Sequence, residues 1–115
     1  MRAVVQRVSE AQVKVAGELV GSIDAGLCLL VGVMDGDTLQ DARYLAKKVA
    51  CLRVFSDDEG RMNLNVSQVK GEVLSISQFT LAGDVRKGHR PGFGRAMEPQ
   101  GAEELFELFC EELRS

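Results

Sequence analysis

The sequence predicts an α+β protein, with a mostly antiparallel, β-barrel-like sheet and two helices packed outside it. Three observations lead to this class. The chain has 115 residues, close to the roughly 100–200 residues of one domain. Strand patterns fill its first third, and helical spacing appears only later, in two separate segments. The composition, 45% hydrophobic and 27% charged, is that of a soluble globular protein.

The first third of the chain has the pattern of β-strands. Residues 3–8 lead into residues 11–16, where valines alternate with polar residues and so predict one wet and one dry face. Gly17 predicts a tight turn into residues 18–23, and therefore a hairpin. The apolar run at 27–34 predicts a central strand that is buried on both faces.

Two later segments have helical spacing. Asp37 with Gln40 fits a capping box, and apolar residues keep helical spacing from there to about Arg53. Pro99 suits the first turn of a second helix, whose glutamates mostly occupy the face opposite its apolar stripe. That stripe comprises Ala102, Leu105, Phe106, Phe109 and Leu113.

A predicted strand at 72–80 lies between the two helices. Its alternation places Gln78 and Thr80 on one face, and Ser77 and Phe79 on the other. Gln78 continues an apolar face, where an unpaired amide would cost about 1–3 kcal/mol. Small polar groups and backbone N–H groups at a strand end, beside a cationic loop, suit an anionic or carbonyl ligand. The alternative is that they are ordinary polar residues of a strand.

The charges are unevenly distributed, although the net formal charge is only −3. Residues 86–95 contain basic side chains and no acid, whereas the C-terminal segment is rich in glutamate. Net charge alone argues against nucleic-acid binding, but a local basic loop is where a phosphate backbone would be bound. The alternative is a solubilising loop. The basic residues are Arg86, Lys87, Arg90 and Arg95.

Several classes of protein are disfavoured by the sequence. The longest apolar run, at 27–31, is far shorter than the roughly 20 residues of a membrane span. The chain starts without a secretory signal pattern, so we expect a cytoplasmic protein with no membrane partner. Widely spaced cysteines and the single His89 argue against a metal site and predict buried thiols in a reducing compartment. The cysteines are Cys28, Cys51 and Cys110.

A side-chain nucleophile has little support in the sequence. Ser77 or Thr80 could act with His89, and Asp84 is the nearest acid in the sequence. Neither hydroxyl residue lies in the Gly-x-Ser-x-Gly elbow that presents the nucleophile in α/β-hydrolases. A generic Ser/Thr esterase is therefore the weakest of three functional hypotheses.

Four collinear segments carry a family resemblance that extends over essentially the whole chain. They are MRAVVQRV at 1–8, MNL at 62–64, SQFTL at 77–81 and RKGHRPGF at 86–93. SQFTL followed by RKG is specific in that combination. Together they resemble the D-aminoacyl-tRNA deacylases, also called D-tyrosyl-tRNA deacylases.

The resemblance implies an editing hydrolase that serves translation quality control. Such an enzyme cleaves the ester that joins a D-amino acid, or glycine mischarged on tRNA-Ala, to the terminal adenosine of tRNA. The resemblance also implies a cytoplasmic homodimer that binds aminoacyl-tRNA and uses no cofactor or metal, with no DNA partner. Which amino acid or tRNA is preferred does not follow from the sequence.

The resemblance also assigns roles to individual residues. In the family the substrate's own 2′-hydroxyl is held to assist, and backbone N–H groups at the strand end hold the carbonyl. Carried over, the catalytic positions are Gln78, Phe79 and Thr80, with the donors on the last two. Met62 and Phe93 become candidates for an adenine pocket. The substrate-binding set comprises Arg7, Met62, Ser77, Arg86, Lys87, Arg90 and Phe93.

One family motif has no counterpart in the sequence. Family members carry Asn-x-Gly-Pro-x-Thr beyond the second helix, and its Gly-cis-Pro excludes L-amino acids from the partner's pocket. Pro91 and Pro99 are not preceded by glycine, and Arg7 resembles the arginine that steadies this motif. Residues 1–115 are therefore expected to be one deacylase domain, apparently C-terminally truncated, that is a poor or unselective D-specific enzyme. The alternative is a catalytically inactive tRNA-binding module.

Overall fold

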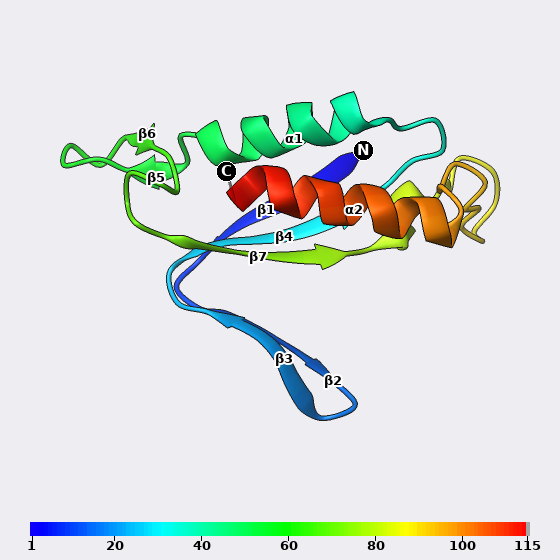
Figure 1. The fold of residues 1–115 in the computed structure, drawn as a ribbon, viewed down its shortest axis with the longest axis horizontal. Helices are drawn as coiled ribbons and strands as arrows, with labels where there is room; N and C mark the ends of the chain where they lie inside the picture. The colour runs from blue at the N-terminus through cyan, green and yellow to red at the C-terminus, as the bar shows by residue number, and fades with distance from the viewer. Residues whose placement is uncertain (115) are drawn as a thin grey trace. The chain divides into compact units, whose positions relative to one another are not determined.

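The computed structural model describes residues 1–114 and confirms the predicted α+β class (Figure 1). The elements are β1 (Arg2–Val8), β2 (Ala11–Val15), β3 (Glu18–Ile23), β4 (Gly26–Gly32), α1 (Leu39–Cys51), β5 (Phe55–Ser56), β6 (Met62–Leu64), β7 (Glu72–Ser77), the 3-10 helix η1 (Phe79–Ala82) and α2 (Pro99–Arg114). The strands pair in three groups: a sheet in the order β1–β4–β7, and the antiparallel pairs β2–β3 and β5–β6. The pairing over residues 1–114 does not close a barrel.

The backbone forms two compact units. The first contains Met1–Val4, Leu30–Lys47 and Ser77–Ser115, and the second contains Val5–Leu29 and Lys48–Ile76. The end of β7, η1 and α2 therefore belong to the first unit. The hairpin β2–β3 and the pair β5–β6 belong to the second.

The core of the first unit is built from the apolar positions that the sequence predicts. Val31 at the end of β4, Ala42 of α1 and Phe109 of α2 are fully buried. Phe109 lies on the predicted stripe of α2, and its burial confirms that face of the helix. At the surface, Arg43 Nε of α1 donates to Glu112 Oε1 of α2 at 3.3 Å. An ion pair therefore joins the two helices at the surface.

The cap of α1 lies one residue later than predicted. The backbone N–H of Thr38 donates to Asp41 Oδ2 at 2.8 Å, and the Thr38 hydroxyl contacts the same oxygen at 3.1 Å. The predicted box of Asp37 with Gln40 is wrong because Asp37 has another partner. Its Oδ2 lies 2.7 Å from the ammonium of Met1.

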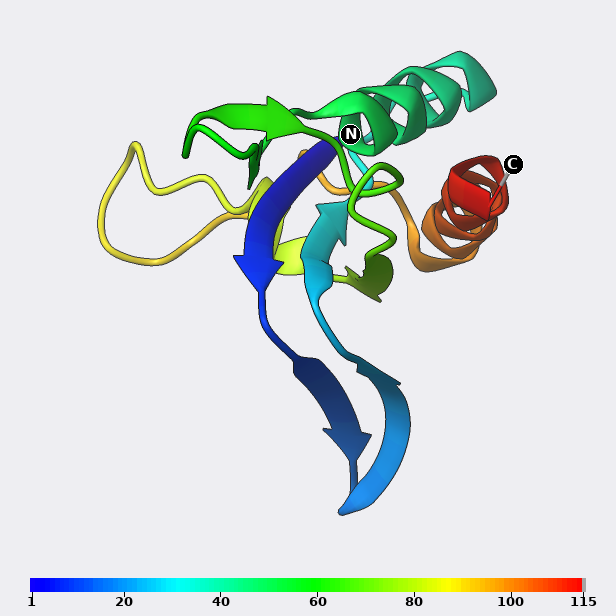
Figure 2. The same cartoon turned by 90° about the vertical axis from the view of Figure 1, so that its left-hand side faces the viewer.

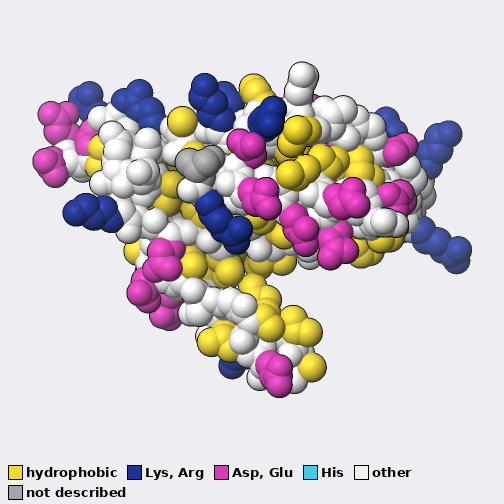
Figure 3. All heavy atoms as spheres, in the orientation of Figure 1, with side chains coloured by type: hydrophobic (Ala, Val, Ile, Leu, Met, Phe, Trp, Pro, Cys, Tyr) yellow, Lys and Arg dark blue, Asp and Glu magenta, His cyan; other side chains and the backbone are white. Residues whose placement is uncertain are grey.

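The hairpin β2–β3 of the second unit confirms the predicted turn. Ala16 and Gly17 both have positive φ, 51° and 85°, as a type I′ two-residue turn requires. The predicted dry face is absent near the tip, where Val15 is 60% exposed. Leu19 and Val20 near the tip are also exposed, because within residues 1–114 β2 and β3 form a sheet of two strands. Figure 3 shows hydrophobic side chains at the surface of this hairpin.

The strand β4 is the central strand of its sheet, as predicted, but the cysteines are not all buried. Leu27 and Leu29 are fully buried, and Cys28 between them is half-buried. Cys51 is exposed at the last position of α1, which corrects the prediction of buried thiols. It lies two residues from the buried Val49, which is roughly 200° around the helix and therefore off the apolar stripe.

Candidate functional site

The candidate site begins where β7 ends. The strand stops at Ser77, three residues before the predicted end, and the chain turns into η1. The backbone N–H of Gln78 donates to the Val31 carbonyl at 2.8 Å, which holds this turn against β4. The predicted alternation of faces is therefore wrong beyond Ser77, because Phe79 and Thr80 have helical rather than strand conformation.

A glycine in β4 allows η1 to lie close to the strand. A Cβ atom on Gly32 would come within 2.9 Å of the Leu81 Cβ and 3.2 Å of the Gln78 carbonyl oxygen. Real Cβ contacts are almost never that short, so any side chain at this position would displace η1. Gly32 therefore sets the position of the first residues of η1.

The start of η1 presents two backbone N–H groups without partners. The first bond of the helix runs from the Leu81 N–H to the Gln78 carbonyl at 3.4 Å. Within residues 1–114, no hydrogen bond is recorded from the N–H of Phe79 or Thr80, as expected for the first positions of a helix. The Gln78 side-chain amide donates to the Thr80 hydroxyl, so it is not the unpaired buried amide that the sequence pattern suggested.

An apolar groove of about 570 Å³ lies beside Phe79, the first residue of η1. Its walls come from the end of β7, from η1, from residues 93–98 and from the first turns of α2. The rings of Phe79 and Phe93 meet edge to face, with centroids 5.3 Å apart and an interplanar angle of 62°. The structure thus brings together three predicted site residues, Ser77, Phe79 and Phe93, in one groove.

The α2 side of the groove was not predicted. Ala102 and Phe106 line it, although the sequence pattern indicates only a core-facing stripe. Glu98 also lines the groove, and its carboxylate accepts hydrogen bonds from the N–H groups of Gln100 at 3.0 Å and Gly101 at 2.6 Å. An acid directly before a helix-starting proline was the available signal, since such a position favours capping of the helix N-terminus.

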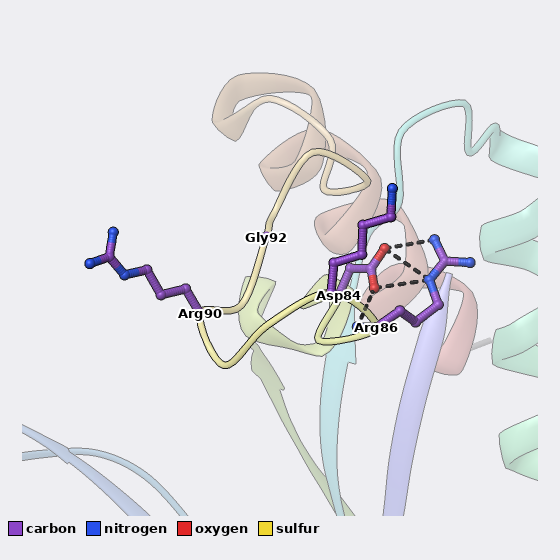
Figure 4. Close-up of a pocket in the computed structure, with 5 residues that line it drawn as sticks. Asp84, Arg86, Arg90 and Gly92 are labelled. Carbon is purple, nitrogen blue, oxygen red and sulfur yellow. Dashed lines mark hydrogen bonds and ion pairs between the residues drawn. The ribbon is translucent and has the colours of Figure 1, made fainter.

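The basic loop between η1 and α2 is closed at its base (Figure 2). The N–H of Asp84 donates to the Gly92 carbonyl at 2.7 Å, and the N–H of Gly92 donates back at 2.8 Å. Inside this bridge, Arg86 Nη2 lies 2.6 Å from Asp84 Oδ2, and Arg86 Nε donates to both carboxylate oxygens (Figure 4). These side-chain hydrogen bonds, with the bond from the Arg86 backbone N–H, lower the pKa of Asp84 to about 2.

The other basic residues of the loop have no such partner. Lys87, Arg90 and Arg95 are exposed, and no ion pair is recorded for them within residues 1–114. The Arg90 side chain extends away from the Asp84–Arg86 pair (Figure 4). Dark blue side chains project from this loop in Figure 3, whereas acidic side chains cover α2.

The hydrogen bonds around Asp84 leave no side-chain triad of the kind that the third hypothesis needs. The Asp84 carboxylate holds Arg86, and no hydrogen bond to His89 is recorded over residues 1–114. The Thr80 hydroxyl accepts a hydrogen bond from Gln78 rather than facing an imidazole. A generic Ser/Thr esterase therefore lacks its charge-relay geometry.

Two predicted substrate-binding residues belong to the second unit and do not line the groove. Arg7 Nη1 donates to the Val54 carbonyl at 2.8 Å, which joins β1 to the segment after α1. Met62 begins β6 and is 67% exposed.

No group of three or more His, Cys, Asp or Glu side chains among residues 1–114 could hold a metal ion. No helix in the same range is both long enough and apolar enough to cross a membrane.

Comparison with known proteins places the chain in a family. The sequence profile described as D-Tyr-tRNA(Tyr) deacylase matches residues 4–115. The chain belongs to the D-Tyr-tRNA(Tyr) deacylase family. A D-aminoacyl-tRNA deacylase of Bacillus cytotoxicus is 57% identical over 114 residues, which cover 99% of this chain and 78% of the relative. One of Halalkalibacterium halodurans is 58% identical over 107 residues, covering 93% of this chain and 73% of the relative.

Solved structures share the fold of this deacylase-family chain. The c-Myc DNA Unwinding Element Binding Protein has a TM-score of 0.93 at 41% identity, covering 99% of this chain and 76% of that one. A probable eukaryotic D-amino acid tRNA deacylase has a TM-score of 0.80 at 18% identity, covering 97% and 66%. The resemblance inferred from the four sequence segments is therefore confirmed.

Proposed function

We propose that the chain hydrolyses the ester bond of D-aminoacyl-tRNA and releases the free D-amino acid and tRNA. Support comes from relatives named for this activity at up to 58% identity over nearly the whole chain. The structural observation that carries the proposal is the pair of unpartnered N–H groups at Phe79 and Thr80, at the start of a helix whose first residue, Phe79, lines an apolar groove. The inactive-module alternative is not favoured, because the relatives are named as enzymes.

The proposed mechanism uses backbone donors rather than a side-chain nucleophile. Water attacks the ester carbonyl, and the N–H groups of Phe79 and Thr80 stabilise the negative charge that develops on its oxygen. The bond between the carbonyl carbon and the ribose oxygen then breaks, and the ribose oxygen takes up a proton. The substrate's own 2′-hydroxyl assists, as the family resemblance implies. Fixed amide donors need no reorganisation during the reaction, which is why such sites can act without a triad.

The groove is suited to the terminal adenosine. Phe79 and Phe93 already pack edge to face, and an exposed aromatic pair offers a stacking surface for a base. Ser77 at the groove wall supplies a hydroxyl that can bond to the sugar or the base. We also keep Arg7 and Met62 as candidate substrate-binding residues, on the strength of the family resemblance alone.

Further properties of the proposed enzyme follow from the resemblance. The chain acts as a homodimer in the cytoplasm and also removes glycine mischarged on tRNA-Ala. Each of these is a proposal that sedimentation analysis or an assay with glycyl-tRNA would test.

The decisive experiment removes one backbone donor while leaving the helix intact. Phe79 is the first residue of η1, and Gln78 before it is extended, with φ −142° and ψ 95°. Proline is favoured at the first position of a helix and after an extended residue, so Phe79→Pro should fold while lacking the N–H. Phe79→Ala is the matched control, because it loses the same ring but keeps the donor.

Hydrolysis of D-tyrosyl-tRNA should distinguish the two variants. We expect Phe79→Pro to be slower than Phe79→Ala by about 10²–10³-fold in kcat, the usual cost of one oxyanion donor. Equal rates in the two variants would exclude the Phe79 N–H from the reaction. If the unsubstituted chain binds tRNA but hydrolyses neither the D- nor the L-aminoacyl ester, it is a binding module.

A further inference from the structure

We propose that the loop closed by Asp84 and Gly92 is a preshaped binding site for the phosphate backbone of the tRNA substrate, in which Lys87 and Arg90 contact phosphates while Asp84 and Arg86 only set the shape. This inference rests on the proposed function, since it takes tRNA as the substrate. It differs from the sequence-based expectation, which treats Arg86 as one of several equivalent phosphate ligands. Arg86 becomes a positioning residue.

The geometry of the loop supports a fixed rather than a flexible site. The reciprocal backbone bonds of 2.7 and 2.8 Å between Asp84 and Gly92 close it at the base. At the far side, Gly88 has a φ of +71°, which a glycine adopts without strain. The concavity inside the loop has a volume of about 630 Å³ and is lined by Asp84, Arg86, Lys87, Arg90 and Gly92.

The charge of Arg86 is already compensated. Its guanidinium makes contacts of 2.6 to 3.1 Å with both oxygens of Asp84, and its backbone N–H donates to the same carboxylate at 3.0 Å. The pKa values agree, since these bonds lower that of Asp84 to about 2 and raise that of Arg86. A phosphate would have to displace this carboxylate before Arg86 could bind it. The Asp84–Arg86 pair therefore carries no net charge when the loop meets tRNA.

Lys87 and Arg90 are the cations of the concavity that remain available. Neither has a recorded ion pair within residues 1–114, and Arg90 extends from the loop (Figure 4). A guanidinium can bind phosphate through two parallel hydrogen bonds, and an ammonium binds it as a compact charge. Arg95 lies outside the Asp84–Gly92 bridge in the sequence, and its charge also helps to lower the pKa of Asp84.

The salt dependence of tRNA binding separates these roles. Each protein cation that neutralises a phosphate steepens the slope of log K against log salt by about 0.9 on duplex DNA and by about 0.7 on single strands. The probe is a deacylated tRNA-Tyr transcript, and its affinity is measured by fluorescence anisotropy between about 50 and 200 mM salt, the range over which this dependence is marked. Lys87→Ala and Arg90→Ala should each flatten the slope by about 0.7–0.9.

The variants of the pair give the opposite pattern. Arg86→Ala should leave the slope unchanged, and Asp84→Asn should steepen it by about 0.7–0.9 because it frees Arg86 to bind a phosphate. Asparagine can still accept the Arg86 backbone N–H, so the local turn is retained. Lys14→Ala, which removes the same charge from β2, is the matched control and should have no effect.

The double variant Asp84→Asn/Arg86→Ala separates the loss of the loop's shape from a change in its charge. It removes the pair and restores the charge balance, so we expect the unsubstituted slope with weaker affinity at every salt concentration. Unchanged affinity in this variant would overturn the shape-setting role. A slope in Arg86→Ala as flat as that in Lys87→Ala would make Arg86 a phosphate ligand and overturn the assignment.

The outcome is independent of the proposed catalysis. If the slopes follow this pattern while D-tyrosyl-tRNA is not hydrolysed, the binding site stands and the proposed hydrolysis fails. If hydrolysis proceeds and none of the loop variants changes the slope, the inference fails alone.

Discussion

The start of η1 and the basic loop lie within twenty residues of each other but use different chemistry. At η1 the proposed functional groups are the backbone N–H groups of Phe79 and Thr80, in a turn held by the bond from the Gln78 N–H to the Val31 carbonyl. In the loop they are side-chain charges, one of which is already paired with Asp84. A backbone donor is insensitive to most side-chain changes, whereas a charged loop responds to each one. Variants at η1 should therefore act through position, and variants in the loop through charge.

The largest change in activity should come from Gly32, which acts by placing η1 rather than by contact with the substrate. Gly32→Ala places a Cβ 2.9 Å from Leu81 and 3.2 Å from the Gln78 carbonyl, so η1 must shift. We expect about 10²-fold lower kcat with D-tyrosyl-tRNA, because small displacements of a reacting geometry are that costly. Gly94→Ala is the control, since no atom lies within 4 Å of its added Cβ. Unchanged kcat in Gly32→Ala would mean that the position of η1 does not govern the reaction.

The next largest effect should be on KM, from loss of the contact between Phe79 and Phe93. Phe93→Ala removes one ring of the edge-to-face contact and the proposed stacking surface for adenine. We expect KM for D-tyrosyl-tRNA to rise by about tenfold, which corresponds to the 1–3 kcal/mol of one base–aromatic stack. Val85→Ala, at an exposed apolar residue of the same segment, is the control and should leave KM unchanged. A fall in kcat with constant KM would place Phe93 in the chemical step instead.

A smaller effect is expected for the Thr80 hydroxyl. Thr80→Ala keeps the N–H and loses only the acceptor of the Gln78 side-chain amide. We expect less than about a threefold change in kcat, because a hydrogen bond at this exposed position contributes modestly. Single-turnover assays of D-tyrosyl-tRNA measure this directly. Loss of turnover with retained binding would identify Thr80 as a nucleophile. In that case η1 would act through a side chain and not through backbone donors alone.

The smallest effect concerns pH. The pKa of Asp84 is lowered from 3.8 to about 2 by its bonds to Arg86, so the native state favours the ionised carboxylate. Its contribution to stability is fully present above pH 3.8 and is lost as the pH falls through about 2. The difference in unfolding midpoint between the unsubstituted chain and Asp84→Asn should therefore be constant above about pH 5 and should shrink as the pH falls toward about 2. A difference that stays constant down to about pH 2 would show that the pair does not form.

Much of the local structure follows from the sequence because it depends on neighbouring residues. Gly17 predicts the hairpin turn, and the spacing of apolar residues predicts both helices and the burial of Phe109. The SQFTL segment also identifies the proposed catalytic region without any tertiary information. The face pattern of this segment could not be predicted, because the bond from Gln78 to Val31 ends the strand early.

The sequence by itself determined the family, the α+β class and the positions of most helices and strands, and it named the candidate site residues. Only the tertiary structure decided which groups are partners. Asp37 does not cap α1 because the ammonium of Met1 reaches it, and the Phe79 ring meets the Phe93 ring across a loop. Helical and strand periodicity is set by backbone geometry over a few residues. The partner of a carboxylate or a ring is set by competition among groups that are brought together only when the chain folds.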